Sequence, residues 1–149
     1  MGEACHMLDL LLHWLGPDVV GWSAQGLPPG DPRTLTAQDV LVSLQLRDPK
    51  GVLHLATLVY ASVGSRDVPK ERIEVHAGGG SLVLEDFAVL EAHGMPLAGA
   101  KLTRPDKGHH EEMRLFIEAV GGKENKLLGV EESYRAADLA LRIREAIRA

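Results

Sequence analysis

The sequence predicts an α+β protein: an open, largely antiparallel or mixed β-sheet of about six strands, with helices packed on one face. Three features carry this prediction. An apolar helix opens the chain, a run of short alternating segments with tight turns follows, and two amphipathic helices fill the C-terminal third. The 149 residues fit one domain, so we expect a single domain over residues 1–149.

The first helix is an apolar run from Met7 to Leu15 that stops at Gly16–Pro17. No capping residue precedes it, although a helix normally begins after Ser, Thr, Asp or Asn. We therefore expect this helix to begin at or before Met1 and the chain to be the back part of a longer protein. The run is too short to span a bilayer, which needs about 20 residues.

A strand and a hairpin are expected next. Val19–Gln25 has strand character, and Leu27–Pro32 is a loop because its prolines and glycine prevent regular structure. Val40–Leu46 alternates, placing Val40, Val42, Leu44 and Leu46 on one face. Asp48–Gly51 has the residues of a type I turn, and Val52–Ala61 returns as the partner strand.

A second meander and two helices complete the chain. The meander has strands at Arg72–His76, Ser81–Leu84 and Phe87–Ala92, with a Gly78–Gly80 turn and a final short strand within Ala100–Thr103. The first of the two helices has the i, i+3, i+4, i+7 stripe Met113, Phe116, Ile117 and Val120 and ends at Gly121; the second spans Glu131–Ala149. We expect the helices to lie together on one face of the sheet.

The hairpin is apolar on both faces, because Leu53, Leu55 and Val59 alternate with Val52, Leu58 and Tyr60. An open sheet with an apolar second face requires a covering partner. The simplest partner is a second copy of the chain, so we expect a homo-oligomer, either a dimer or a tetramer.

Composition excludes several classes of function. A net charge of −5 and a pI near 5.8 argue against nucleic acid or an anionic membrane as a partner. One cysteine, Cys5, rules out an internal disulfide and a cysteine-based zinc framework. The absence of a signal peptide makes a cytoplasmic location the default expectation.

The opening helix also carries a polar stripe. His6, Asp9 and His13 are spaced i, i+3 and i+7, which places them on one helix face. Polar groups against a core are costly unless they are paired. The stripe therefore predicts either partners elsewhere in the fold, as in a hydrogen-bonded buried His6–Asp9 pair, or a cavity where chemistry takes place.

The segment from Gly2 to Leu11 resembles the start of the C-terminal domain in the Gfo/Idh/MocA family of nicotinamide-dependent oxidoreductases. There, a glycine-rich lead-in precedes a His, two residues and an Asp on a buried helix. Glu71–Phe87 is similar to the family's central hairpin and Asp106–Val120 to its late helix. The residues of these segments are most similar to those of family members that are fused to a zinc-alcohol-dehydrogenase-like half. The resemblance covers nearly the whole chain in order.

The resemblance implies that His6 is catalytic, exchanging a proton with a substrate hydroxyl while hydride moves to the nicotinamide. Imidazole suits this role because its unperturbed pKa is near 6.5. Asp9 and Glu3 are the implied substrate-binding residues, and the substrate is a sugar, polyol or derivative. Many family members carry an Asp four residues before the histidine, whereas this chain has Gly2 there, so His6 is the residue carried over most directly.

The cofactor implied for the full-length enzyme is NAD or NADP. This chain lacks the strand, Gly-x-Gly-x-x-Gly turn and helix that bind a dinucleotide, because Gly78–Gly80 leads into another strand. The family's catalytic lysine also belongs to that missing half. We therefore expect no cofactor site here and no turnover by the isolated chain.

Other interpretations stay open. His6, Asp9 and His13, or His109–Glu111, offer metal-ligand types, although adjacent histidines point in different directions on a helix, and we expect no metal site. Cys5 beside His6 suggests a thiol nucleophile, but helix neighbours diverge by about 100°, so we expect a small core residue. The alternative function is a stand-alone, non-catalytic dimeric scaffold or small-ligand binding module.

Overall fold

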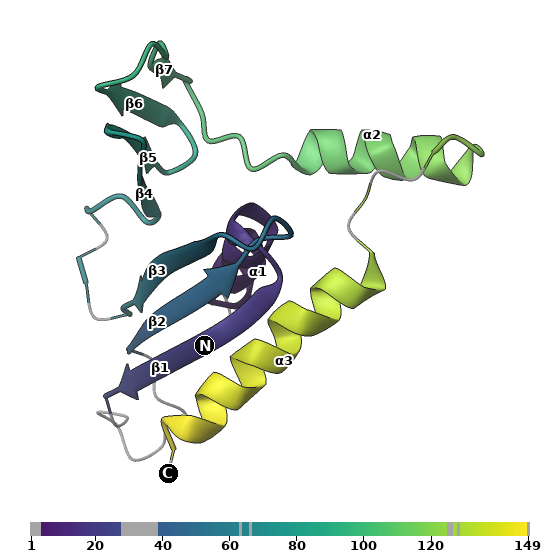
Figure 1. Cartoon of the computed structure of the whole chain (residues 1–149). Coiled ribbons are helices and arrows are strands. Elements are labelled where there is room, and N and C mark those ends of the chain that lie inside the picture. Colours follow the sequence, from purple (N-terminus) through teal and green to yellow (C-terminus); the bar gives the residue numbers. More distant parts are fainter. Residues whose placement is uncertain are drawn as a thin grey trace. The chain divides into compact units, whose positions relative to one another are not determined.

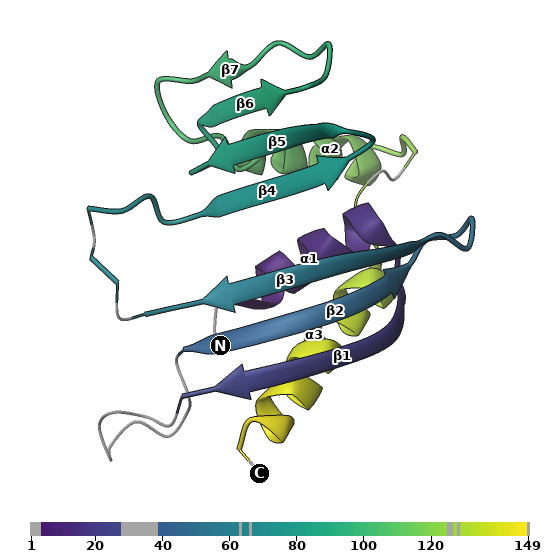
Figure 2. The same ribbon diagram turned by 60° about the vertical axis from the view of Figure 1, so that its left-hand side comes forward.

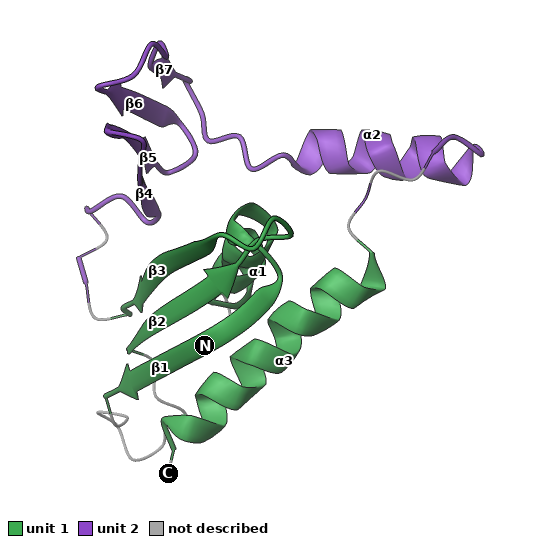
Figure 3. Ribbon diagram, viewed as in Figure 1, with its two compact units in different colours: residues 1–63, 128–149 green, residues 64–127 purple. Residues whose placement is uncertain are grey.

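The structure is a computed structural model that describes residues 4–27, 39–62, 64–65, 67–124, 127 and 129–148. Two compact units make up the chain (Figure 3). Unit 1 consists of residues 1–63 and 128–149, and unit 2 consists of residues 64–127. The prediction of a single domain stays a prediction. Glu3, most of the predicted 27–32 loop and Ala149 lie outside the described residues.

Unit 1 is a three-stranded antiparallel sheet covered on one face by two helices (Figure 1). Its elements are α1 (Ala4–Leu15), β1 (Asp18–Gly26), β2 (Val40–Arg47), β3 (Leu53–Tyr60) and α3 (Val130–Ala146). The strands lie in the order β1–β2–β3, each antiparallel to its neighbour (Figure 2). The helices α1 and α3 lie against each other and against the sheet.

The core of unit 1 follows the alternation of β2. Val40, Val42, Leu44 and Leu46 are all buried, as the sequence predicts for one face of this strand. They pack against Leu8 and Leu12 of α1 and against Ala136, Leu139 and Ile143 of α3. The opposite face of the sheet is open, and its apolar side chains Leu41, Leu53, Leu55 and Val59 are exposed.

The predicted turn between β2 and β3 is confirmed. The backbone N–H of Gly51 donates to the carbonyl oxygen of Asp48 at 2.9 Å, which closes the turn. The Asp48 carboxylate also accepts hydrogen bonds from the backbone N–H groups of Lys50 and Val52, each at 2.9 Å. Its other oxygen lies 3.5 Å from Nε2 of His54. One carboxylate therefore organises the whole turn.

This turn makes the free energy of unfolding of unit 1 depend on pH in the acidic range. The Val52 N–H, followed by the Lys50 N–H and His54, holds the pKa of Asp48 below its ordinary value of 3.8. Because the folded-state pKa is the lower one, the stabilisation is present above the unfolded-state pKa and is lost as pH falls through the folded-state pKa. NMR titration of the carboxyl carbon should give a pKa below 3.8. In the Asp48→Asn variant, the free energy of unfolding measured with urea should no longer show the part of its fall below pH 4 that protonation of Asp48 causes.

A close backbone contact fixes the end of α1. Gly16 has a φ of +117°, and a Cβ built there would lie 2.3 Å from the carbonyl oxygen of Arg47 at the end of β2. Only glycine tolerates this conformation and this approach together. The glycine therefore anchors the last turn of α1, which carries His13, against the sheet.

Within its described residues, unit 2 contains a four-stranded antiparallel sheet and one helix. Its strands β4 (Arg72–Ala77), β5 (Gly80–Glu85), β6 (Val89–His93) and β7 (Ala100–Lys101) lie in chain order (Figure 2). As the sequence predicts, Gly78 and Gly79 form the hairpin turn between β4 and β5, with Ala77 paired to Gly80. The described part of unit 2 buries only Gly80, so this unit has little core of its own.

The start of β6 differs from the prediction. Phe87 was expected in the strand, but Asp86 and Phe87 have φ values of 49° and 54°, and Ala88 N–H donates to the Glu85 carbonyl oxygen at 2.9 Å. Two left-handed residues match the right-handed twist of a tight hairpin. Glycine is the usual residue at such positions, so Asp-Phe gives no sequence signal for the turn, and β6 begins at Val89.

The predicted fold class is confirmed, with one difference in arrangement. The chain is α+β with antiparallel sheets and three helices in its described part, but its strands form two sheets of three and four strands instead of one sheet of about six. Helices α1 and α3 share one sheet face, as expected. The third helix, α2 (His109–Val120), has no buried residue. None of these helices has the length and apolar composition that a membrane crossing requires.

Candidate functional site

The polar stripe predicted from the sequence lies on α1, away from the core. The core side of α1 is formed by Ala4, Leu8 and Leu12. His6 and His13 are exposed, and Asp9 is half-buried at the border between the two sides. No polar or charged side chain is fully buried in the described part of the chain. The alternative of a buried His6–Asp9 pair is therefore wrong, and the stripe is open to a ligand.

A small pocket adjoins this stripe where α1 meets the start of α3. Its volume is about 30 Å³, and a water molecule needs at least about 10–15 Å³. Sites for whole small molecules are about ten times larger or more, at 300–1,000 Å³. The pocket therefore admits a single functional group or one or two waters. It is lined by Asp9, Leu12, His13, Pro17, Glu132 and Arg135.

The residues around the pocket include hydrogen-bond acceptors and donors. Asp9 and Glu132 supply carboxylates, and His13 and Arg135 supply an imidazole and a guanidinium. The Asp9 carboxylate makes no hydrogen bond or ion pair within the described ranges. Arg135 Nη2 lies 3.5 Å from Oε1 of Glu131, an exposed pair worth about 0–1 kcal/mol, so a ligand competes easily for the guanidinium. The wall of the pocket itself is almost entirely apolar, so it favours a small apolar group.

The structure brings some of the predicted site residues together and leaves others apart. Asp9 lines the pocket, and His6 lies exposed one helical turn before it without lining it. Glu3 lies outside the described residues. Cys5, predicted as a small core residue, is half-buried.

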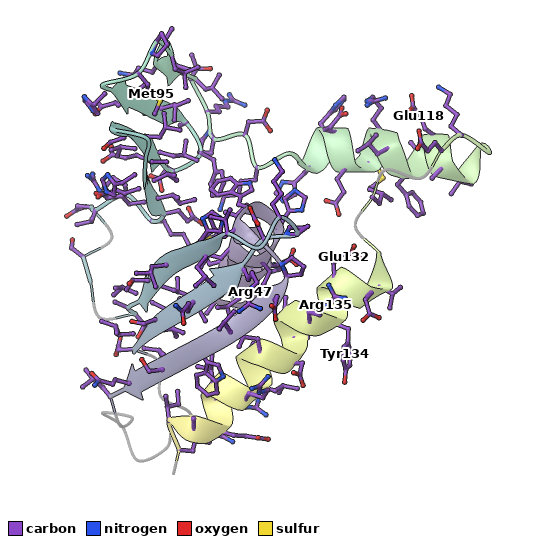
Figure 4. All side chains as sticks on the ribbon, in the orientation of Figure 1. Arg47, Met95, Glu118, Glu132, Tyr134 and Arg135 are labelled. Carbon is purple, nitrogen blue, oxygen red and sulfur yellow. The ribbon has the colours of Figure 1, made fainter. Side chains whose placement is uncertain are left out.

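Sequence reasoning missed Glu132 and Arg135, which lie near the start of α3 (Figure 4). Both belong to a helix that was expected to pack through an apolar stripe. Helical periodicity identifies the buried side of α3 but gives no information on which helix lies beside it. Only the contact between α1 and α3 places these two side chains next to Asp9.

The metal-ligand and dinucleotide-binding candidates from the sequence do not form a site in the structure. Across the described residues, no group of three or more His, Cys, Asp or Glu side chains could hold a metal ion. His109, His110 and Glu111 are all exposed on α2. The Gly78–Gly80 segment joins β4 to β5 and does not open a helix, so it lacks the helix N-terminus that receives a pyrophosphate.

Comparison with known proteins identifies a shared fold. No protein-family profile matches the chain, and no curated protein matches its sequence. Among solved structures, the chain is similar to the biliverdin reductase of Synechocystis sp. PCC 6803, in its crystal structure with biliverdin and NADP+. The TM-score is 0.66 at 14% sequence identity, and the match covers 98% of this chain but 45% of the reductase. The chain thus has the fold of somewhat less than half of that reductase.

Proposed function

We propose that this chain is the C-terminal, substrate-binding and oligomerisation domain of an NAD(P)-dependent oxidoreductase that acts on a sugar, polyol or derivative. The observation that carries the proposal is the match of 98% of the chain to 45% of a reductase crystallised with NADP+. The ordered resemblance of three segments to the Gfo/Idh/MocA family supports the same conclusion independently. A cytoplasmic location belongs to this proposal.

The dinucleotide belongs to another domain in this proposal, because the Gly78–Gly80 turn leads into a strand and not into a helix. Bound there, NAD or NADP would supply the hydride acceptor. The residues of this chain would supply the proton chemistry. His6, exposed on α1, takes the proton of a substrate hydroxyl, and an imidazole is suited to this near neutral pH.

Asp9 would bind and orient the substrate beside His6. Its half-buried carboxylate has no partner in the described residues, so it is available to accept a hydrogen bond from a substrate hydroxyl. The adjoining pocket, of about 30 Å³, holds one substituent of the substrate and leaves the rest outside. Glu3 is proposed as a further substrate contact on the basis of the resemblance alone.

The oligomerisation role is proposed from the open face of the unit 1 sheet. Leu53, Leu55 and Val59 of β3 and Leu41 of β2 form an exposed apolar surface there. Such a surface on a water-soluble protein marks an interaction site. A second copy of the chain presents the same surface, so a two-fold contact covers both at once.

The first experiment is to measure the mass of the native polypeptide in its source cells by immunoblot, with an antibody raised against this chain. A band well above 16.1 kDa supports a domain of a larger oxidoreductase. That enzyme is then assayed with NAD+ and NADP+ against sugars, polyols and biliverdin. A band at 16.1 kDa contradicts the proposal and favours the stand-alone binding module.

In the native enzyme, His6→Ala should lower kcat by about 10²–10⁴-fold, the usual contribution of a general acid–base. KM should change little, because the imidazole acts on the reacting proton and Asp9 remains in place. His6 is exposed, so the thermal midpoint should stay within a few degrees. His109→Ala, which removes an exposed histidine on α2, is the control. Unchanged kcat in His6→Ala would exclude the catalytic role.

A further inference from the structure

One face of the unit 2 sheet is apolar across three strands. Ile73 of β4 is paired with Leu84 of β5, and Leu84 is paired with Leu90 of β6, so these side chains form a first row on one face. A second row on the same face, two residues along each strand from the first, consists of Val75, Leu82 and Ala92. All of these side chains are half-buried and none is fully buried. The apolar face therefore has no complete cover.

Helix α2 of the same unit has an exposed apolar stripe. The stripe consists of Met113, Phe116, Ile117 and Val120, and each of these side chains is more than half exposed. The helix has no buried residue at all. On its opposite side, Arg114 forms ion pairs with Glu111 and Glu118. A helix with one charged side and one apolar side is the kind that normally packs its apolar side against another element.

The segment that leads into α2 is fixed to one end of this sheet. Lys107 Nζ lies 2.5 Å from Glu71 Oε1, just before β4, and 5.5 Å from the centre of the Phe87 ring. The backbone N–H of Asp106 donates to the carbonyl oxygen of Phe87 at 3.1 Å. Phe87 lies between β5 and β6, so the anchor is at the end of the sheet nearest the first row.

Gly108 is the joint between this anchor and α2, which begins at His109. Its φ is +79°, in the left-handed region. A Cβ built there would meet no atom within 4 Å, so close packing does not restrict this position. Glycine has access to conformations on both sides of φ = 0, and a change at one such residue can redirect a whole helix.

We propose that α2 is a hinged lid, which turns at Gly108 and closes its apolar stripe over the apolar face of the unit 2 sheet in the same chain. The structure shows the lid open. Closure removes both apolar surfaces from water, which favours the closed state in solution. This inference is independent of the proposed oxidoreductase function.

The dimensions of the helix and the sheet match. The 12 residues of α2 extend about 18 Å, and the 6 residues of β4 or β5 extend about 20 Å. The two apolar rows are about 7 Å apart along the strands, and Met113 lies one helical turn, about 5.4 Å, before Phe116 and Ile117. A helix laid back from the anchored end therefore places Met113 over the first row. Phe116 and Ile117 then lie over the second row, where the small side chain of Ala92 leaves room for the aromatic ring.

The anchor favours the helix of the same chain over that of a second copy. Because Lys107 is held at the end of the sheet, α2 meets the apolar face at a high effective concentration, whereas a second copy has to arrive from solution. Closure would also supply the core that unit 2 lacks. Gly80 is the one buried residue among those described in residues 64–127.

The first test is a nuclear Overhauser measurement on the whole chain. The chain has two phenylalanines, so the ring signals of Phe116 are readily distinguished from those of Phe87. We expect contacts from the Phe116 ring to the methyl groups of Leu82 and Ala92. A mixture of labelled and unlabelled chains separates contacts within one chain from contacts between copies. The absence of these contacts, or their presence only between copies, overturns the proposal.

The second test is the Phe116→Ala variant, which keeps the helix because alanine is the better helix former. We expect the backbone amides of β5, the strand between β4 and β6, to exchange hydrogen at least about tenfold faster, because the variant loses the burial of an aromatic ring. Tyr134→Ala is the matched control, since it removes another aromatic ring that is more than half exposed, on α3 of unit 1. Its β5 exchange should be unchanged. Unchanged exchange in Phe116→Ala, or equal effects of both substitutions, contradicts closure of the lid.

Discussion

Replacing Leu46 by alanine should lower the free energy of unfolding by about 2–5 kcal/mol, the range for a fully buried leucine. Leu46 is 0% exposed at the end of β2 and packs in the same cluster as Leu8 of α1 and Ile143 of α3. Alanine leaves a cavity where the sheet and both helices meet. Urea unfolding followed by far-ultraviolet circular dichroism at 25 °C gives the difference directly.

Leu55→Ala is the matched control. It removes the same atoms from the neighbouring strand of the same sheet, but Leu55 is 83% exposed on the opposite face. At protein concentrations low enough to keep the chain monomeric, its effect should stay within about 0.5 kcal/mol. Equal losses from the two substitutions would contradict the assignment of the core to the helix-covered face.

Leu55→Glu should convert the expected dimer or tetramer into a smaller species. In the proposed interface, the new carboxylate on each copy is buried without a partner, which is strongly unfavourable. Light scattering at micromolar concentration should give a dimeric or larger mass for the natural chain and a monomeric mass for the variant. Its circular dichroism spectrum should be unchanged, because Leu55 makes no contribution to the core cluster.

Leu141→Glu is the control for this substitution. It places the same charge at another exposed leucine, on α3 instead of the open sheet face. The association should persist in this variant. A monomeric natural chain, or dissociation by both variants alike, would show that the open sheet face is not the contact between copies.

Much of the fold was predictable because the local signals are strong. The alternation of Val40 to Leu46 gave the buried face of β2, and Asp48-Pro49-Lys50-Gly51 gave the turn that follows it. The spacing in α2 and α3 gave both helices to within a few residues. These features depend on neighbours in the chain, which a sequence displays directly.

The remaining features depend on contacts between distant segments. The alternation of apolar and polar residues shows which face of a strand is buried, but it does not show which strands pair edge to edge. The division of the strands into two sheets therefore could not be predicted. Asp9 was predicted as a site residue, whereas Arg135 reaches the same pocket from the far end of the chain.

The interleaving of the two units sets an order for synthesis on the ribosome. Unit 1 combines the first 63 residues with residues 128–149, so α1 and its sheet emerge long before α3. Leu139 and Ile143 are part of that core, which therefore stays open to water and chaperones until α3 has been translated. The hairpins of unit 2 join strands that are adjacent in the chain and pair early, because short loops close at low entropic cost. The nascent protein thus pairs the strands of unit 2 before it completes unit 1, whose two segments flank unit 2 in the sequence.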